Sequence, residues 1–323
     1  MKCCTRRKFL KHASVSVAAP LCRGCVPSLS GLLFQTPAPH LQFPAEPRQR
    51  LSVSSYPFRE YITGQHDARQ HDGQGAAEKM PLKDFAAHIS TKFNVRKVEP
   101  WSEHFLSLER SYLDEIRDAA SKAGSGFANV AADGENSLYS SDSAERDRAI
   151  QFAKTWIDVA LHIGSPSVRI NIAAARDAKP DVARVAEGLK PIADHGSSRN
   201  IVVHLENDNP VSEDPFFIVS VVERANSPWI HALPDFGNSL AALPPENAYR
   251  GLDQMFAHAY AISHVKDTTT TPAKRVVEVD LERIFAMAKK QNYKGVFSME
   301  WETAGDVYAG TSKLIAITLK NLS

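Results

Sequence analysis

Eight short apolar segments that alternate with helix-like segments constrain the fold of this chain more than any other sequence feature. They begin near residues 51, 96, 127, 167, 201, 230, 261 and 295, about 35 residues apart on average. Between them, apolar residues recur at helical spacing. Strict alternation of strands and helices requires a parallel sheet, and eight repeats of this size match a closed (β/α)8 barrel. We therefore predict such a barrel.

An open parallel sheet with helices on both faces is the alternative architecture. Such sheets commonly carry a glycine-rich phosphate-binding turn after the first strand. Here the first strand-like run, Leu51–Ser55, leads into Tyr56-Pro57-Phe58-Arg59 and not into a glycine-rich turn. Because barrels of about 250 residues form one domain, we assign residues 51–323 to a single (β/α)8 barrel domain.

The boundaries of the expected elements follow from apolar spacing and from helix start and stop signals. The predicted strands are 51–55, 96–99, 127–131, 167–172, 201–207, 230–235, 261–267 and 295–300. The predicted helices are 81–92, 106–123, 142–163, 180–195, 214–225, 246–260, 280–290 and 308–322. The polar stretch 60–80, which contains His66 and His71, is predicted to be a long solvated loop, with the alternative that it folds over the mouth of the barrel.

The first 50 residues differ in composition from the rest of the chain. Residues 1–45 contain six Lys or Arg and no acidic residue. The sequence Thr5–Lys11 (TRRKFLK) resembles a twin-arginine export signal, and the apolar stretch 13–21 is too short to span a bilayer. We therefore predict that residues 1–50 are a twin-arginine signal peptide and an extended linker. The predicted location is periplasmic or otherwise extracytoplasmic, with no stable membrane insertion after export.

Charge and cysteine content exclude several other classes of protein. Beyond residue 45 the chain has 37 acidic and 32 basic residues, which gives a net charge of −5 and disfavours nucleic acid as a partner. All four cysteines lie within the first 25 residues. The predicted barrel therefore has neither an internal disulfide nor a thiolate metal ligand. The sequence leaves open whether the protein forms a homo-oligomer.

Four consecutive predicted strands end in residues that commonly bind metal ions. These residues are Glu206, Asp235, His264 and Glu300. In a (β/α)8 barrel the carboxyl ends of the strands meet at one mouth, and three carboxylates with one imidazole suit a divalent cation. The alternative is that they are helix caps or charges at the rim, but several acids at one mouth repel each other unless a cation neutralises them. Glu302 could replace Glu300 as a ligand, but Glu300 directly ends the apolar run.

Five further residues are candidates for binding a substrate or supporting the reaction. Lys266 lies two residues after His264 and projects to the same side of its strand. Glu99 could bond substrate hydroxyl groups, Trp101 could stack on an apolar face of a substrate, and Arg169 is exposed on one face of the fourth strand. His204 alternates with Glu206, so it faces inward one layer lower; we expect either substrate binding or a buried, hydrogen-bonded position. Each could instead have only a structural role.

At these residues the chain resembles the sugar phosphate isomerase/epimerase superfamily with the xylose isomerase-like TIM barrel. The resemblance covers roughly residues 51–323. It is carried by Val98-Glu99-Pro100-Trp101, Ser167-Val168-Arg169, Leu205-Glu206-Asn207, Asp235-Phe236-Gly237-Asn238, His264-Val265-Lys266-Asp267 and Ser298-Met299-Glu300-Trp301-Glu302. It implies one divalent metal ion (Mn, Mg, Co or Zn) held at the positions of Glu206, Asp235, His264 and Glu300. Many members carry a His where this chain has Asp208, so the substrates of relatives do not transfer directly.

The resemblance implies a metal-dependent sugar or keto-sugar isomerase or epimerase. Such a reaction removes a proton from carbon next to a carbonyl, and the cation stabilises the resulting enediolate. We expect Glu206 and Glu300 to be both ligands and the acid/base pair, and Lys266 to support oxyanion charge. Two alternatives remain open. One is a metal-dependent lyase or dehydratase that eliminates from a 3-keto-glycoside or related keto-sugar. The other is a non-catalytic sugar-binding protein.

Overall fold

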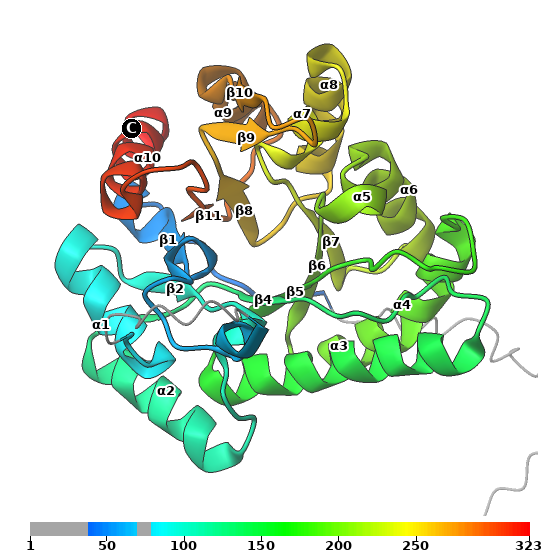
Figure 1. The fold of residues 1–323 in the computed structure, drawn as a ribbon, viewed down its shortest axis with the longest axis horizontal. Helices are drawn as coiled ribbons and strands as arrows, with labels where there is room; N and C mark the ends of the chain where they lie inside the picture. Colours follow the sequence, from blue (N-terminus) through cyan, green and yellow to red (C-terminus); the bar gives the residue numbers. More distant parts are fainter. Residues whose placement is uncertain (1–37, 70–78) are drawn as a thin grey trace, which may run out of the picture. The chain divides into compact units, whose positions relative to one another are not determined.

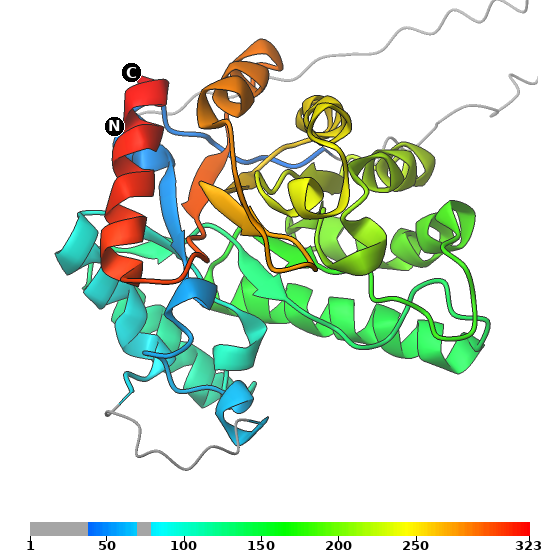
Figure 2. The same ribbon diagram turned by 45° about the horizontal axis from the view of Figure 1, so that its top comes forward.

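The computed structural model describes residues 38–69 and 79–323, which form a ring of parallel strands surrounded by helices (Figures 1 and 2). Parallel ladders join the strands into two arcs, β3-β2-β1-β11-β8 and β4-β5-β6-β7. A parallel bridge between Trp101 and Ala131 connects the arcs on one side, and a bridge between Asp235 and His264 connects them on the other. The ring is therefore closed, and the predicted (β/α)8 barrel is confirmed.

The strands of the ring agree closely with the predicted segments. They are β1 (Leu51–Ser54), β2 (Lys97–Glu99), β3 (Gly126–Phe127), β4 (Val130–Ala132), β5 (Ser167–Ile170), β6 (Val202–Glu206), β7 (Ile230–Leu233), β8 (Ile262–Val265) and β11 (Val296–Met299). The third position of the ring, predicted as one strand, is divided into β3 and β4. After β8 the chain adds an antiparallel ribbon of β9 (Thr268–Thr270) and β10 (Val276–Glu278), which the sequence prediction missed.

A long helix follows each position of the ring. These helices are α1 (Leu82–Phe93), α2 (Arg110–Lys122), α3 (Ser143–Ile163), α4 (Val182–Ser197), α6 (Pro215–Ala225), α8 (Pro245–Ala257), α9 (Leu281–Lys290) and α10 (Val307–Leu322). Short helical segments lie in the connections. They are α5 (Asn209–Ser212), α7 (Asn238–Ala242), η1 (Pro47–Arg50), η2 (Tyr56–Phe58), η3 (Gln65–Arg69) and η4 (Ser102–His104).

Aspartate caps explain why so many helix starts could be predicted. The side chains of Asp142, Asp181, Asp214, Asp280 and Asp306 each accept a hydrogen bond from a backbone N–H in the first turn of the following helix. These N–H groups have no partner within the helix, so a capping carboxylate stabilises the helix at that residue. The caps therefore determine the residue at which α3, α4, α6, α9 and α10 begin.

The interior of the barrel is divided into an apolar layer and a polar region. Ala128, Leu233, Ile262 and Val296 form a buried cluster separate from the main core between strands and helices. Leu233, Ile262 and Val296 lie two or four residues before Asp235, His264 and Glu300, so they share a strand face with these polar groups. The apolar layer therefore lies inside the ring, at its amino-terminal side, and the polar side chains lie above it.

The close approach of α4 to β6 depends on a glycine and gives a first prediction. A Cβ atom at Gly196 would lie 2.6 Å from the carbonyl oxygen of Ile201, which directly precedes β6. We expect Gly196→Ala to lower the free energy of unfolding by about 1–3 kcal/mol, because the backbone must move. Thermal or urea unfolding would measure this, with Gly126→Ala as a control where the added Cβ meets no atom within 4 Å. Equal stability of the two variants would contradict the prediction.

Residues 38–50, which the sequence prediction assigned to the linker, contact the amino-terminal side of the barrel. Tyr260 Oη donates to the carbonyl oxygen of Pro39 at 3.2 Å, and Phe43 packs against the ring of Tyr260. Arg50 donates to the carbonyl oxygens of Tyr293 and Gly295. Residues 1–37 lie outside the described residues, so the export signal remains a prediction. Among the described helices, none has the length and apolarity needed to cross a membrane.

Candidate metal centre

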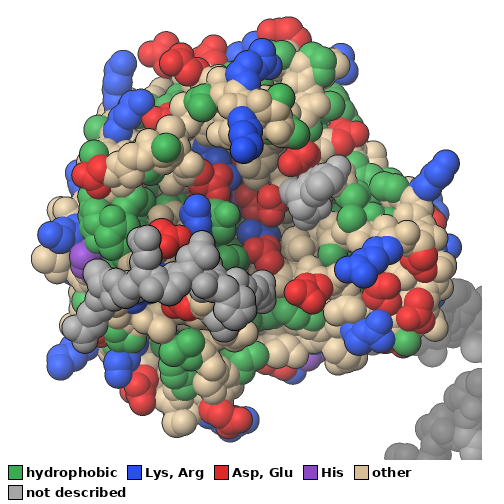
Figure 3. All heavy atoms as spheres, in the orientation of Figure 1, with side chains coloured by type: hydrophobic (Ala, Val, Ile, Leu, Met, Phe, Trp, Pro, Cys, Tyr) green, Lys and Arg blue, Asp and Glu red, His purple; other side chains and the backbone are tan. Residues whose placement is uncertain are grey.

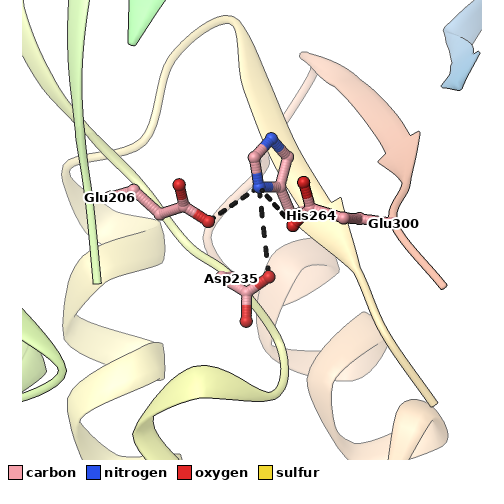
Figure 4. Close-up of side chains that lie close together, drawn as sticks. All are labelled: Glu206, Asp235, His264 and Glu300. Carbon is pink, nitrogen blue, oxygen red and sulfur yellow. Dashed lines mark hydrogen bonds and ion pairs between the residues drawn. The ribbon is translucent and has the colours of Figure 1, made fainter. Parts of the chain in front are cut away.

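The four predicted ligand residues converge at the carboxyl ends of four neighbouring strands (Figure 4). Glu206 ends β6, Asp235 follows β7, His264 lies on β8, and Glu300 follows β11. One potential ligand atom from each lies within 4.8 Å of the others, and all four residues are buried. Ligand atoms on opposite sides of a common ion are about 4.2 Å apart, so this spacing is close to that of a metal site.

The Nδ1 atom of His264 is the centre of the cluster. It lies 2.7 Å from Glu206 Oε1, 3.2 Å from Glu300 Oε2 and 4.0 Å from Asp235 Oδ2. Burial alone would lower the pKa of His264, but the carboxylates of Glu300, Glu99 and Glu206 raise it well above its ordinary value. The site thus strongly favours positive charge at this point. The electrostatic field that raises this pKa would also attract a divalent cation.

Glu99 holds the other side of the imidazole ring. Its carboxylate oxygens lie 2.9 and 3.0 Å from His264 Nε2, and Asn129 Nδ2 donates to Glu99 Oε1 at 2.7 Å. Nε2 would donate to Glu99, so Nδ1 is the ring nitrogen that would give up its proton and offer its lone pair when an ion binds at the carboxylate cluster. Glu99 is fully buried and does not line the cavity described below. Glu99, predicted to bind substrate, thus lies behind the imidazole ring, in a position suited to orienting His264.

This contact gives a second prediction. Glu99→Gln is expected to weaken binding of Mn²⁺ about tenfold, because a neutral amide holds Nε2–H less strongly and makes Nδ1 a weaker donor. Titration of the purified variant with Mn²⁺ would measure the dissociation constant. Asn129→Ala is a milder control, since it removes one hydrogen bond to Glu99 but keeps the carboxylate. Unchanged Mn²⁺ affinity in Glu99→Gln would show that this carboxylate does not tune His264.

Hydrogen bonds from nearby backbone N–H groups hold the Asp235 side chain so that one of its carboxylate oxygens faces the cluster. Its Oδ1 accepts from the backbone N–H groups of Gly237 and Asn238 at 2.8 and 2.7 Å. Asn207 accepts from the Asp235 N–H at 2.7 Å and donates to its carbonyl oxygen at 3.0 Å. These bonds explain the Asn after Glu206, whose side chain holds the Asp235 backbone, whereas Gly237 and Asn238 contribute backbone N–H groups. They leave Oδ2 of Asp235 directed toward His264 and Lys266.

The hydrogen bonding and the pKa values of the carboxylates indicate that the cluster suits a cation. Within the described part of the chain, Asp235 Oδ2 is a buried carboxylate oxygen that accepts no hydrogen bond, and the cations beside it are Lys266 Nζ at 3.4 Å and His264 Nδ1 at 4.0 Å. Burial raises the pKa of Asp235 to about 6, and it also raises that of Glu206. Buried carboxylates at this separation are costly unless positive charge offsets them. Hard oxygen ligands with one imidazole suit Mn²⁺, Mg²⁺, Co²⁺ or Zn²⁺.

Lys266 places a second positive charge beside the same carboxylates. Its Nζ lies 3.2 Å from Glu300 Oε2, 3.4 Å from Asp235 Oδ2 and 2.6 Å from Glu302 Oε2. Burial alone would lower its pKa, but these acidic neighbours, Asp235 first, raise it well above its ordinary value. Lys266 therefore remains an ammonium group at the edge of the cluster. Glu302, considered above as an alternative ligand, pairs with Lys266 and lies outside the set of four.

A cavity of about 500 Å³ opens onto the cluster. Figure 3 shows a hollow in the centre of this face, where acidic and basic side chains gather. It is lined by Tyr56, Arg59, His66, Trp101, Asp133, Arg169, Glu206, Asp208, Asn238, Lys266, Glu300 and Glu302. Trp101 and Arg169 thus occupy positions suited to the substrate-binding roles predicted for them. His204 does not line the cavity: it is fully buried, and its Nε2 accepts from the Ala261 N–H, which is the buried, hydrogen-bonded position expected as the alternative to substrate binding.

Several residues that line the cavity were not identified from the sequence. Tyr56 packs edge-on against Trp101 with ring centroids 4.9 Å apart, and Arg59 lies over the Tyr56 ring. His66, predicted in a solvated loop, is buried beside Trp101; His71 lies outside the described residues. Tyr56 and Asp133 follow the ends of strands, so the rule that located the ligands could have located these two residues. No comparable signal marks His66.

Comparison with known protein families finds a match over most of the chain. Residues 90–319 match the family model described as xylose isomerase-like TIM barrel. A search of curated proteins by sequence finds no significant match.

Three solved structures illustrate the similarity of fold. A xylose isomerase-like TIM barrel protein from Mycobacterium smegmatis in complex with magnesium has a TM-score of 0.62 at 16% identity, over 84% of this chain and 96% of that one. D-allulose 3-epimerase from Methylomonas sp. in complex with D-allulose has a TM-score of 0.62 at 12% identity, over 87% and 97%. A 3-keto-D-glucoside 4-epimerase from E. coli has a TM-score of 0.60 at 10% identity, over 84% and 99%.

Proposed function

This chain belongs to the xylose isomerase-like TIM barrel family, and from this premise we propose that it is a divalent-metal-dependent isomerase or epimerase of sugars or keto-sugars. The observation that carries the proposal is the convergence of Glu206, Asp235, His264 and Glu300 within 4.8 Å at a cavity. Two of these residues, Glu206 and Glu300, also line the cavity, so they can contact both an ion and a substrate. A site that only binds sugar has no need for two such carboxylates.

The four residues would hold one divalent ion. When bound, such an ion would stabilise negative charge that develops on substrate oxygens next to the carbon that loses its proton. Asp235 and His264 would serve as ligands only, because neither lines the cavity. Their buried positions and backbone bonds make them rigid, which keeps the cluster in place while a substrate enters and leaves.

Glu206 and Glu300 would move the proton. One carboxylate takes the proton from a carbon next to the carbonyl, and the electron pair remains on the substrate as an enediolate. The other carboxylate then supplies a proton to the opposite face of the same carbon, or to the former carbonyl carbon while the hydroxyl proton of the enediolate moves to the former carbonyl oxygen. The first outcome gives an epimer and the second gives an isomer. Ser54 Oγ donates to Glu300 Oε1 at 3.1 Å, and this bond would fix the orientation of Glu300.

Lys266 and the aromatic side chains would position the substrate. The Lys266 ammonium lies beside Glu300 and lines the cavity, so it can support negative charge on a substrate oxygen. The indole of Trp101 offers an apolar face on which the C–H face of a sugar could stack. Because the similar structures include enzymes named for D-allulose and a 3-keto-D-glucoside, we propose a keto-sugar as the substrate class.

Exchange of substrate hydrogen with solvent tests this function. The enzyme would be loaded with Mn²⁺, Mg²⁺, Co²⁺ or Zn²⁺ and incubated in D2O with D-allulose, D-fructose and 3-keto-glucosides. We expect deuterium at the carbon next to the carbonyl of at least one keto-sugar, and loss of exchange after chelation. A lyase would instead release a fragment by elimination, which product analysis would detect. Binding of these sugars without exchange would identify a sugar-binding protein and contradict the proposal.

A further inference from the structure

One chain of contacts runs along the cavity wall from Trp101 to Glu206. Trp101 Nε1 donates to Asp133 Oδ2 at 2.7 Å. The other oxygen of Asp133 pairs with Arg169 Nη1, and Arg169 Nε lies 2.8 Å from Glu206 Oε2. All four residues line the cavity. Asp133 therefore stands between an aromatic side chain at the mouth and a carboxylate of the candidate metal centre.

The backbone that carries Asp133 is held in place by separate bonds. Its N–H donates to Ser102 Oγ at 3.2 Å, and the next residue, Gly134, exchanges two hydrogen bonds with the side chain of Asn171. The Asp133 carboxylate is thus presented from a fixed loop directly after β4. A change confined to this carboxylate should alter its two side-chain contacts without releasing the loop.

Asp133 affects the candidate metal centre because it helps to balance the charge of Arg169, which also contacts Glu206. The Arg169 side chain is only 6% exposed, and the carboxylates of Asp133 and Glu206 offset its charge. If Asp133 were neutral, Glu206 and Asp208 would have to balance the charge of Arg169. The guanidinium would then compete more strongly with a divalent ion for the Glu206 carboxylate.

We infer that Asp133 is a positioning residue that couples the stacking side chain Trp101 to the metal-binding carboxylate of Glu206 through Arg169. The inference rests on the proposed function, in which Glu206 binds the ion and Trp101 contacts the sugar. A sugar that fixes the indole of Trp101 also fixes Asp133 and the guanidinium of Arg169. Binding of a sugar at Trp101 therefore affects the position of the Glu206 carboxylate, the group that binds the ion and moves the proton in the proposed function.

Binding of Mn²⁺ alone, without sugar, tests the coupling. We expect Asp133→Ala to weaken Mn²⁺ binding about tenfold and Asp133→Asn to weaken it less, since the amide keeps an acceptor for Trp101 Nε1. Trp101→Phe, which keeps an aromatic ring but removes the N–H donor, should weaken Mn²⁺ binding in the wild-type background. In the Asp133→Ala background, Trp101→Phe should have no further effect, because the link is already absent.

Asp67→Asn is the matched control. Asp67 is a carboxylate of similar exposure, 31% against 33% for Asp133, and it bonds Gly64 N and Lys79 Nζ. Its replacement should leave Mn²⁺ affinity unchanged. Thermal melting establishes folding of each variant, and Asp133→Asn carries the test if Asp133→Ala does not fold.

Two results would overturn the inference. One is wild-type Mn²⁺ affinity in the folded Asp133 variants. The other is that the effects of Asp133→Ala and Trp101→Phe multiply as if independent. Either result, with wild-type protein that binds Mn²⁺, leaves the proposed function standing. Failure of the wild-type protein to bind any of the four divalent ions would remove both.

Discussion

Glu300→Gln is expected to lower kcat about 10³-fold with little effect on folding. The amide cannot accept and return a proton, whereas its size and shape match the carboxylate. Ser54 can still donate to the amide oxygen, as it does to Glu300 Oε1. The same loss is expected for Glu206→Gln, because the proposed reaction needs one carboxylate to take a proton and another to supply one. Steady-state kinetics and solvent deuterium exchange would measure the loss, and thermal melting would report on folding.

Glu302→Gln is the control for this prediction. Glu302 lies two residues after Glu300, lines the same cavity and pairs with Lys266 at 2.6 Å, but it is outside the ligand cluster. Its replacement should reduce turnover much less than either of the two changes above. If Glu206→Gln or Glu300→Gln retained full activity, the assignment of these carboxylates to proton transfer would be wrong.

Asp235→Asn is expected to weaken Mn²⁺ binding by at least about a hundredfold. Replacing a residue that only supports a metal ligand lowers metal affinity by up to about that factor, and Asp235 is itself a proposed ligand. The amide oxygen can replace Oδ1 and accept from the N–H groups of Gly237 and Asn238. The amide nitrogen then takes the place of Oδ2, where it offers hydrogen atoms and no lone pair to an ion. The loop should keep its conformation while the site loses a ligand. Calorimetric titration with Mn²⁺ would measure the change.

The same substitution at a helix cap provides a comparison. Asp214 accepts from the Phe216 N–H at the start of α6 and is not part of the cluster, so Asp214→Asn should keep wild-type Mn²⁺ affinity. Asp235→Asn also removes a buried charge, so its thermal stability without metal should not fall. Wild-type Mn²⁺ affinity in Asp235→Asn would exclude Asp235 as a ligand.

The sequence predicted the barrel and the ligand cluster for one shared reason. Parallel strands place their carboxyl ends at the same level, so a polar residue that ends an apolar run has a known position in space. Glu206, Asp235, His264 and Glu300 all follow this rule. The helix starts at residues 142, 214 and 280 could be predicted because Asp is a strong helix cap there.

The depth at which a side chain lies within the barrel could not be predicted in the same way. Alternation along a strand shows that His204 and Glu99 face inward, but it does not show which layer reaches the cavity. His66 was missed because its surroundings in sequence are polar, whereas its ring is buried against Trp101 and His104. The role of Asp133 depends on contacts with residues 32 and 36 positions away in sequence, which a single sequence does not reveal.

The apolar layer of Ala128, Leu233, Ile262 and Val296 closes the barrel below the charged groups. The pocket is therefore blind-ended on that side, and substrate, product and solvent share the mouth at the carboxyl ends of the strands. A sugar seated in the pocket would shield a captured hydrogen from bulk solvent. Some of the hydrogen that one carboxylate removes should then return from it to the substrate without exchange with solvent, and the fraction retained in recovered substrate should fall as the residence time lengthens.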